Sequence, residues 1–383
     1  MKIEVTRFRE PFYILYLEVI VGVVGFLLLF FVFLTHSIDE EFRMVSAWTK
    51  TASGGNQMER DENITVKGDF YINRITLREQ FVHYFEKNGD TTLFLNLRRG
   101  EFATCGRDSF IVYERYGEKI TCYGLDRRPM WVRETKTYPD FAPAASVIVL
   151  RTSENMSFSL LDNNNNELST PVRAGEFITD SGFSRYTGDF AAGYINGQFC
   201  YVYRTGKMSF LTSAILSEKN VVKGIALSEY GNFVGVVSGL RPEYISVYSA
   251  AGKLRWYKPT GQARRRASSI VMSEKYNTML TLTDYGVLFY DLASGAVKAQ
   301  YQFNDAAMEF SSYMKADVFG QFAFVGIAKQ GLSRILLIDH KNNNILWQTT
   351  FDSWVYDVAF SSRGDEYLVT TDKFIYCYKR IQL

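Results

Sequence analysis

The sequence is poor in the residue types that build metal and redox centres. It has 383 residues but only four cysteines and three histidines. No two cysteines have the Cys-x-x-Cys spacing of zinc knuckles and disulfide oxidoreductases. His36, His83 and His340 lie far apart in the chain. The sequence therefore predicts no metal and no cofactor, and nothing in it supports a histidine-based catalytic triad.

The sequence also lacks an excess of charge of either sign. Lys and Arg together number 43 and Asp and Glu 41, which gives a formal net charge of +2 at pH 7. Nucleic acids are bound through a concentrated positive field, so the overall charge does not favour them as partners. Phe and Tyr are abundant, with 30 and 25 copies. Both residue types are enriched in strands, which favours an all-β chain.

One long apolar run lies near the amino terminus. Between Phe12 and Leu34 the only charged residue is Glu18. Such a run spans a hydrocarbon core of about 30 Å at about 1.5 Å per residue, and it is longer than the apolar region of a cleaved signal peptide. We therefore expect an uncleaved signal anchor, with a transmembrane helix over residues 12–35. Glu18, an ionisable group inside the span, is a candidate contact with a membrane partner.

The charges on either side of this run predict its orientation. Basic residues precede it and acidic residues follow it: Lys2, Arg7 and Arg9, then Asp39, Glu40 and Glu41. Because positive charge stays on the cytoplasmic side, we expect residues 1–11 in the cytoplasm and the rest of this single-pass protein outside it, at the cell membrane. Residues 36–63 are expected to form a flexible juxtamembrane linker, with a short helix possible over 37–50, because 51–63 are polar and contain a Gly pair.

From residue 64 to residue 383 the pattern changes to that of a β domain. Short runs of Val, Ile, Phe and Tyr alternate with turn residues, and the turns recur about every 44 residues. These turn positions are Ala144, Gly188, Gly231, Tyr276, Gly320 and Gly364. Four short strands per unit at this period predict a β-propeller, whereas a β-sandwich would not keep so regular a period.

The repeat predicts seven blades over about residues 91–383. EFATCG, DSFIVYER, KITCYGL and MWVRE, between residues 101 and 134, supply the strands of the first blade, while the last unit, 352–383, contains only three. TTLFLNLRR (91–99) is expected to complete the last blade as its outer strand, which closes the ring and removes exposed edges. FVHYFEK (81–87) is the alternative closing strand.

Two kinds of repeat element carry a resemblance to known families. ALSEYGNF (226–233) and AFSSRGDEY (359–367) resemble the strand–turn–strand element of WD40-type repeats. AAGKLRWYKP (250–259), NNNILWQTTF (342–351) and RRPMWVRET (127–135) resemble the Gly-turn-Trp element of PQQ-like (quinoprotein-like) repeats. With its single span, the chain is also similar to membrane-anchored bacterial propeller families of unknown function. The Trp-Asp and Gly-His signatures of WD40 repeats and the cofactor motifs of quinoproteins are missing, so the resemblance implies a fold but neither a quinone nor an activity.

The repeat also gives the expected roles of several conspicuous residues. Trp131, Trp256 and Trp347 share a position on the fourth strand, where large aromatic rings are expected to pack between neighbouring blades. Cys122, Cys200 and Cys377 are expected to share an apolar packing position on the third strand, in different blades and without disulfides between them. The Asn runs at 163–166 and 342–344 are expected to form turns.

The candidate partner-binding residues form a predicted basic rim. Arg264, Arg265 and Arg266 are consecutive in the connection between the predicted fourth and fifth blades. Connections between blades and second-to-third-strand loops share one face of a propeller. Those segments also carry Arg115, Lys136, Arg241 and Lys329. Because the Arg fork suits carboxylates and phosphates, the rim predicts a protein or an anionic ligand as partner; a solvated loop is the alternative.

These observations favour a non-catalytic function. We expect a membrane-anchored extracytoplasmic β-propeller that acts as a protein-interaction scaffold or a ligand-binding sensor module. One alternative is a propeller hydrolase or lyase with its active site at the channel mouth, which requires convergent carboxylates or a histidine. His340, in a third-to-fourth-strand turn, is expected on the face opposite the rim. A quinoprotein-like envelope-assembly factor is a further alternative.

Overall fold

The computed structural model describes most of the chain after residue 41. The described residues are 42–51, 70–75, 80–85, 90–114, 116–142, 147–173, 176–214, 220–261, 267–303, 309, 313–329, 331–360, 366–371 and 374–382. The chain divides into a small unit, residues 1–45 with 379–383, and a large unit, residues 46–378, which contains most of the described strands. The predicted transmembrane helix and Glu18 lie outside the described residues. Among the residues that are described, no helix is long and apolar enough to cross a membrane.

The described strands form eight sheets, of which seven have four strands and one has three. The first sheet contains β2 (Phe70–Ile75), β3 (Gln80–Phe85) and β4 (Thr91–Asn96). The second contains β5 (Glu101–Cys105), β6 (Ser109–Glu114), β7 (Lys119–Gly124) and β8 (Pro129–Glu134). The third contains β9 (Thr137–Phe141), β10 (Val147–Thr152), β11 (Ser157–Asp162) and β12 (Val172–Arg173). The fourth contains β13 (Ile178–Phe183), β14 (Phe190–Tyr194), β15 (Gln198–Val202) and β16 (Met208–Ser213).

The other four sheets follow the same plan. The fifth contains β17 (Val222–Leu227), β18 (Phe233–Ser238), β19 (Tyr244–Ser249) and β20 (Leu254–Pro259). The sixth contains β21 (Ile270–Ser273), β22 (Thr278–Leu282), β23 (Gly286–Asp291) and β24 (Val297–Gln302). The seventh contains β25 (Tyr313–Phe319), β26 (Phe322–Lys329), β27 (Leu332–Asp339) and β28 (Asn344–Phe351). The eighth contains β29 (Val355–Phe360), β30 (Glu366–Thr371), β31 (Phe374–Gln382) and β1 (Phe42–Thr51).

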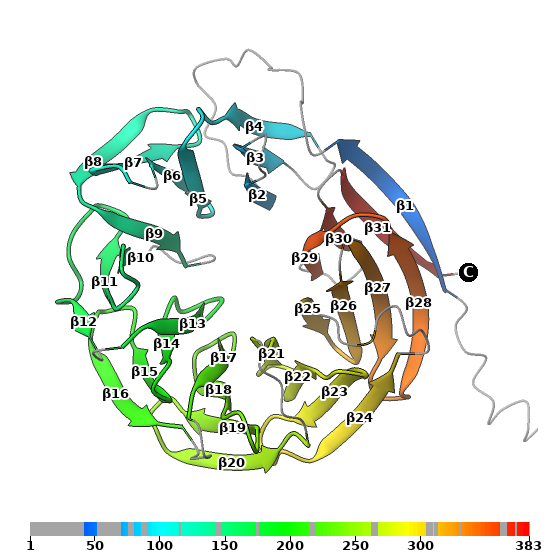
Figure 1. The fold of residues 1–383 in the computed structure, drawn as a ribbon. Helices are drawn as coiled ribbons and strands as arrows, with labels where there is room; N and C mark the ends of the chain where they lie inside the picture. The colour runs from blue at the N-terminus through cyan, green and yellow to red at the C-terminus, as the bar shows by residue number, and fades with distance from the viewer. Residues whose placement is uncertain are drawn as a thin grey trace, which may run out of the picture. The chain divides into compact units, whose positions relative to one another are not determined.

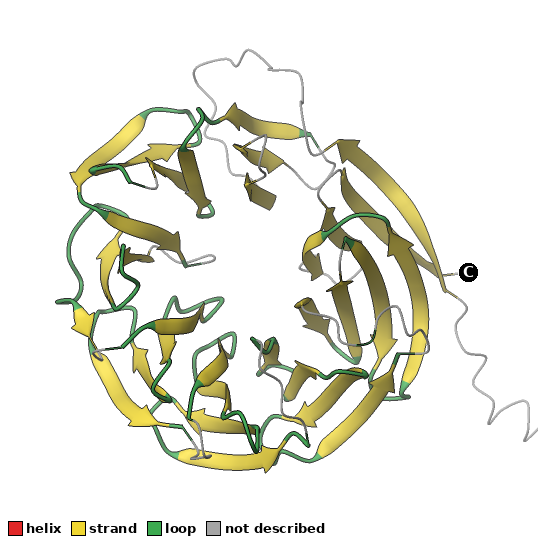
Figure 2. Cartoon of the chain, viewed as in Figure 1, coloured by secondary structure: helices red, strands yellow, loops and turns green. Residues whose placement is uncertain are grey.

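Within the large unit the sheets stand side by side in a ring, as Figure 1 shows. The described part of the chain is built from strands and the loops that join them (Figure 2). The all-β propeller expected from the repeat is therefore confirmed, but the prediction of seven blades is wrong, because the described strands form eight sheets. The additional sheet is the first one, β2–β4.

The closing strand also differs from the prediction. The segment expected to complete the last blade, 91–99, contains β4, which pairs with β3 in the first sheet. The alternative segment, 81–87, overlaps β3 and belongs to the same hairpin. The outer strand of the eighth sheet is β1, so a strand takes the place of the short helix expected over 37–50 and lies within the range assigned to the linker, 36–63. Strands that follow each other in the chain usually pair, and β3 and β4 are separated by only five residues, so β4 pairs with β3 and the closing position is left to β1.

A hydrogen bond identifies the place of β3 within the first sheet. On β15, the third strand of the fourth sheet, the Tyr201 hydroxyl donates to the Gly231 carbonyl at 2.9 Å, in the first-to-second-strand loop of the next sheet. On β3, the Tyr84 hydroxyl donates to the Gly106 carbonyl at 2.7 Å, in the corresponding loop of the second sheet. We conclude that β2, β3 and β4 occupy the second, third and fourth positions of a sheet whose first position has no described strand.

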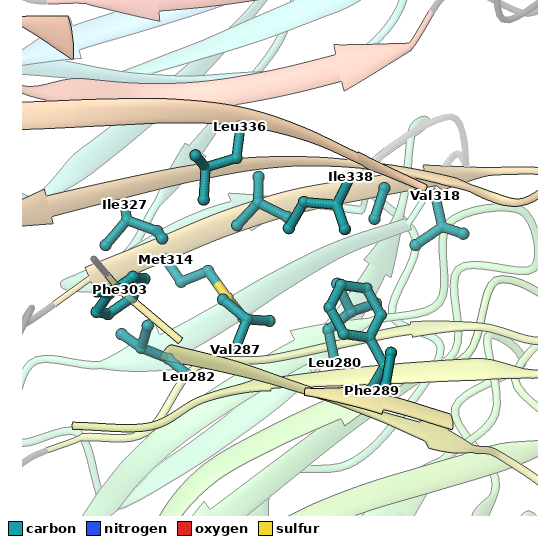
Figure 3. Close-up of a cluster of buried hydrophobic side chains, with 13 residues drawn as sticks. Leu280, Leu282, Val287, Phe289, Phe303, Met314, Val318, Ile327, Leu336 and Ile338 are labelled. Carbon is teal, nitrogen blue, oxygen red and sulfur yellow. The ribbon is translucent and has the colours of Figure 1, made fainter. Parts of the chain in front are cut away.

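The hydrophobic core lies between neighbouring sheets. Because sheets stand face to face around the ring, the middle strands are covered on both sides; all five residues of β22 are buried. Figure 3 shows one such interface, where Leu280 and Phe289 of the sixth sheet face Val318 and Ile338 of the seventh. Burying a side chain of this size stabilises the fold by about 1.5–3 kcal/mol relative to exposure. These interfaces therefore hold the ring together without any disulfide among the described residues.

Three fourth-strand tryptophans connect their own sheet to the next one. The Trp256 indole donates to the Leu292 carbonyl at 2.8 Å, and the Trp131 indole donates to the Asn163 carbonyl at 2.7 Å. In both cases the acceptor belongs to the third-to-fourth-strand turn of the following sheet. Trp347 of the seventh sheet lies 4.9 Å from the ring of Tyr378 in the eighth. The predicted packing of these rings between blades is confirmed.

The cysteines are buried free thiols, as predicted, but they do not all share one position. Cys122 lies opposite Trp131 of the neighbouring fourth strand, whereas Cys200 lies opposite Leu211 of its own fourth strand. The residue equivalent to Cys122 is Tyr201, which lies opposite Phe210. Cys200 is one residue earlier, so its side chain points to the other face of the sheet. Burial raises the pKa of the Cys122 thiol to about 12 and that of Cys200 to about 11, which keeps both protonated.

Candidate functional site

The predicted basic rim is only partly visible. Arg115 and the three consecutive arginines 264–266 lie outside the described residues, as does Glu18. Arg241 is exposed in the loop between β18 and β19. Lys329, the last residue of β26, donates from Nζ to the Glu309 carbonyl at 2.5 Å, and Lys136 forms an exposed ion pair with Glu118 at 3.1 Å. Two of the three described cations are therefore already engaged by oxygen atoms of this chain.

The opposite face carries a more ordered set of loops. The first-to-second-strand loops of the fourth, fifth and sixth sheets contact each other through side chains. The Glu229 carboxylate accepts hydrogen bonds from the Ser273 hydroxyl at 2.6 Å and from the Glu274 amide at 2.5 Å. The Glu274 carboxylate in turn accepts from the Ser228 hydroxyl at 2.9 Å. These charge-assisted bonds hold the loops of the fifth and sixth sheets in one arrangement.

Exposed aromatic rings project from these fixed loops. Tyr186 and Tyr230 lie with their ring centroids 5.2 Å apart, and they are 52% and 47% exposed. The backbone amide of Tyr186 donates to the Glu229 carbonyl at 2.9 Å, which ties the two loops together. A pair of large rings that stays half exposed on rigid backbone is typical of the anchor residues of protein interfaces, where Tyr is enriched.

Two cations border the rings. The Arg185 guanidinium lies 5.9 Å from the Tyr186 ring centroid, and the Lys275 ammonium lies 5.1 Å from that of Tyr276. A hydrogen bond with Tyr276, together with the nearby Tyr230 and Tyr186 hydroxyls, raises the pKa of Lys275 above its ordinary value. Lys275 therefore keeps its charge. We call these five residues, Arg185, Tyr186, Tyr230, Lys275 and Tyr276, the aromatic patch.

The aromatic patch is continuous with a small cavity near the centre of the ring. The cavity has a volume of about 160 Å³ and is lined by residues of the fourth to seventh sheets, including Arg185, Glu229 and Asp317. Arg185 of the fourth sheet forms an ion pair with Asp317 of the seventh at 3.1 Å. The Asp317 carboxylate also accepts from the Phe360 amide at 2.9 Å. The charged groups of the cavity are thus already hydrogen bonded to each other or to backbone.

Two carboxylates on first strands have perturbed pKa values. Desolvation raises the pKa of Asp140 on β9, against the opposing effect of Arg151, with which it pairs at 3.5 Å. Desolvation also raises the pKa of Asp180 on β13, against the amides of Ile225 and Ser181, which donate at 2.8 and 2.9 Å. Raised carboxylate pKa values are one feature of catalytic acids, so they are the feature most relevant to the enzyme alternative. Within the described residues, no group of three or more His, Cys, Asp or Glu is placed to hold a metal ion.

His340 lies where the sequence placed it, in the turn between β27 and β28. Its ring stacks on Phe289 with centroids 5.7 Å apart, and burial lowers its pKa. Third-to-fourth-strand turns share a face with first-to-second-strand loops in an antiparallel sheet, so His340 is on the side of the aromatic patch. The aromatic patch was not among the predicted site residues. The available signal was a tyrosine shortly before the turn glycine in RYTG and EYG, at 185–188 and 229–231.

The fold and the site define the class of this protein as a β-propeller whose exposed loops form an aromatic face. No protein-family model matches the chain, and no curated protein matches it in sequence. Among solved structures, it is similar to BamB from Moraxella catarrhalis, with a TM-score of 0.59, 9% identity, and coverage of 88% of this chain and 98% of that one. It is also similar to the C-terminal WD40 domain of Sif2, with a TM-score of 0.56, 10% identity, and coverage of 82% and 97%. These likenesses confirm the WD40-like and PQQ-like propeller fold.

Proposed function

We propose that this protein is a membrane-anchored, extracytoplasmic propeller that binds another protein through the aromatic patch, without catalysing a reaction. The observation that carries the proposal is the half-exposed Tyr186–Tyr230 pair. The backbone bond from Tyr186 to Glu229 holds one of its loops, and the Glu229 and Glu274 carboxylates hold the other. Such preorganisation lowers the entropy lost on binding. The apolar run at residues 12–34 supports the anchor, and the charges on either side of it support the external location.

The experiment compares two sets of tyrosine variants in intact membranes. Tyr186→Ser combined with Tyr230→Ser removes both rings, while Tyr257→Ser removes a ring of similar exposure, 52%, from β20 on the outside of the fifth sheet. After chemical cross-linking, we expect the double variant to lose the cross-linked complexes of the wild type and Tyr257→Ser to retain them. Equal cross-linking in all three proteins would contradict the proposal.

The raised pKa values of Asp140 and Asp180 favour a second candidate, a propeller hydrolase or lyase. Against it, Asp140 pairs with Arg151 and Asp180 accepts two backbone amides, which suits a structural role. Asp140→Asn and Asp180→Asn would abolish turnover of a substrate if either carboxyl were the catalytic acid or base. We expect both variants to retain the cross-linked complexes of the wild type.

A further inference from the structure

A groove separates the first sheet from the outer part of the second. It has a volume of about 1030 Å³. Leu95 and Leu97 lie on one side of the groove, and Phe110, Tyr123 and Val132 lie on the other. Charged side chains line the rest of it: Arg98, Glu101, Glu114, Glu118, Lys119, Arg127, Glu134 and Lys136. The groove reaches the loop residues Gly117 and Glu118 and also Lys136 of the predicted basic rim, and none of the aromatic-patch residues lines it. It is therefore a site separate from the one that carries the proposed function.

The groove exists because the side chains that close other junctions are short here. Leu93 lies opposite Tyr84 in the first sheet, and Trp131 lies opposite Cys122 in the second, so Leu93 and Trp131 occupy equivalent positions. Two residues further on, Leu95 is therefore equivalent to Arg133. Arg133 spans its junction and donates to Asn165 Oδ1 of the next sheet at 3.1 Å. An aliphatic side chain of the length of Leu95 does not cross the same gap.

A second position on the fourth strand also carries a shorter side chain at this junction. It lies four residues after the position of Trp347, which Leu93 occupies in the first sheet. In the seventh sheet this residue is Phe351, whose ring contacts Tyr376 of the eighth sheet at 4.9 Å. In the first sheet it is Leu97, which lines the groove. Two positions that reach the next sheet elsewhere thus carry shorter side chains at this junction.

The opposite wall shows what is missing. At other junctions the third-strand tyrosine is covered by the fourth strand of the preceding sheet: Tyr290, which is 3% exposed, lies 5.8 Å from Trp256. Tyr123 is the equivalent residue of the second sheet, and it is only partly buried. Val132, on the neighbouring strand, is 54% exposed. Tyr123 and Val132 therefore form an apolar part of this wall that lacks the ring found at the Trp256–Tyr290 junction.

The outer edge of β4 borders the groove. The first sheet has the order β2-β3-β4, so no described strand pairs with the second edge of β4. The Phe94 carbonyl of β4 accepts a hydrogen bond at 3.1 Å from Nη2 of Arg127, a residue in the next sheet. A β4 carbonyl is therefore within reach of a donor from outside its own sheet. Open edges of this kind accept an added strand through backbone hydrogen bonds, and adjacent pockets select its alternate side chains.

We infer that the edge of β4 and the groove together bind an extended peptide of a partner protein. The peptide adds to β4 as a further strand, and an aromatic side chain at an alternate position enters the groove over Tyr123 and Val132. This chain's own segment before β2, residues 52–69, contains no Phe, Tyr or Trp, so it does not supply an aromatic anchor. The anchor takes the place that Trp256 takes over Tyr290.

The test uses a mixed library of nine-residue peptides in which Val, Leu, Phe, Tyr or Trp alternate with Thr, Lys or Glu. A control library has the same composition in scrambled order. Each is selected on the purified full-length protein in detergent and analysed by mass spectrometry. Val132→Asp places a charge in the groove. Tyr257→Asp is the matched control, because Tyr257 follows Trp256 as Val132 follows Trp131, and its exposure is 52% against 54%.

On the wild type and on Tyr257→Asp, we expect alternating peptides with an aromatic central residue to be enriched at least about tenfold over scrambled ones. We expect no such enrichment on Val132→Asp. A tenfold loss of binding corresponds to about 1.4 kcal/mol. N-methylation of alternate peptide amides should abolish the enrichment. Equal enrichment on Val132→Asp, or none on the wild type, would overturn the inference. So would a photo-cross-linker at position 132 that reacts, in intact membranes, with residues 52–69 of the same chain or with a second copy. Loss of the aromatic-patch complexes would leave these results unchanged, so the two sites are tested separately.

Discussion

Trp256 lies so close to Gly295 that a Cβ atom on the glycine would be 2.5 Å from Cδ2 of the indole. The glycine belongs to the turn between β23 and β24, in the sheet after that of the tryptophan. The same relationship recurs one junction earlier, where a Cβ on Gly252 would be 2.9 Å from the Phe210 ring. The turn glycine therefore serves two needs: it adopts a positive φ, and it leaves room for the ring of the preceding sheet.

Gly295→Ala separates these two needs when it is compared with Gly261→Ala. Both glycines have a φ of +71°, but nothing lies within 4 Å of a Cβ on Gly261. Gly261→Ala should lower the free energy of unfolding by about 1–2 kcal/mol, the cost of the left-handed backbone. Gly295→Ala should lower it by a further ~1–3 kcal/mol, because the methyl group overpacks the interface. Urea unfolding followed by tryptophan fluorescence gives both values, and equal losses would show that the ring contact contributes nothing.

The buried ion pair between Lys223 and Glu243 predicts a large single-mutant effect. Their side chains are 4% and 0% exposed, and the Thr260 hydroxyl donates to the Glu243 carboxylate at 2.8 Å. Lys223→Met removes the cation from a carboxylate that stays buried, which should cost about 3–5 kcal/mol of unfolding free energy. Adding Glu243→Leu should recover most of that loss, since two apolar side chains replace two charges.

Lys136→Met is the control for the buried pair. Lys136 pairs with Glu118, but their side chains are 75% and 79% exposed. Breaking an exposed pair should cost less than about 1 kcal/mol. If Lys223→Met were no more destabilising than Lys136→Met in the same denaturant titration, the ion pair would not be buried in the folded protein.

Much of the fold was predictable because local patterns determine it. The spacing of turn positions such as Gly188 and Gly231 set the repeat, and Trp256 marked the fourth strand. The first sheet was not predicted as a separate blade. Its sequence nevertheless has the spacing of a third-to-fourth-strand turn, because Gly89 precedes Leu93 by four residues, as Gly252 precedes Trp256. Its hairpin has the pattern of a third and a fourth strand, but no first strand lies among the described residues before it, so the unit does not show the full pattern of a blade.

The aromatic patch was less predictable than the fold. Tyr186 and Tyr230 belong to different sheets, and they come together only because neighbouring sheets stand side by side in the ring. Turn residues of this kind are ordinarily solvated, and nothing local distinguishes them from other exposed tyrosines such as Tyr257. The predicted basic rim relied on charge alone, which says where cations are but not which groups of the same chain they contact, as the Lys136–Glu118 pair illustrates.

Asp180 predicts a defined pH dependence of stability. Desolvation raises the pKa of its carboxyl in the folded state above the ordinary value of 3.8, so the folded protein binds this proton more tightly than the unfolded chain does. The stability contributed by this group is therefore greatest below about pH 4 and falls as the pH rises through the folded-state pKa. Asp180→Asn removes this titration.

The measurement is the free energy of unfolding of both proteins at pH 4 and pH 7. Losing one backbone acceptor lowers the stability of Asp180→Asn at both pH values, since the carboxylate binds the Ile225 and Ser181 amides. The advantage of the wild type over Asp180→Asn should nevertheless be smaller at pH 7 than at pH 4. An advantage that grows with pH would mean that the folded state favours the ionised carboxylate.

The proposed location outside the cytoplasm predicts thiol labelling from outside the cell. The four native cysteines are buried, so they give little background. Tyr257→Cys introduces a thiol at a position that is 52% exposed in the wild type. A membrane-impermeant maleimide should label this variant in intact cells and leave the wild type unlabelled. Labelling that requires cell lysis would place the propeller in the cytoplasm.

The central claim is that the protein binds its partner with the aromatic patch and not with the opposite, basic face. Photo-cross-linking amino acids placed singly at Tyr186 and at Arg241 test it most directly, because both residues are exposed and they lie in loops at opposite ends of their strands. In intact membranes, the account predicts a discrete protein adduct from position 186 and none from position 241. An adduct from position 241 alone would contradict it.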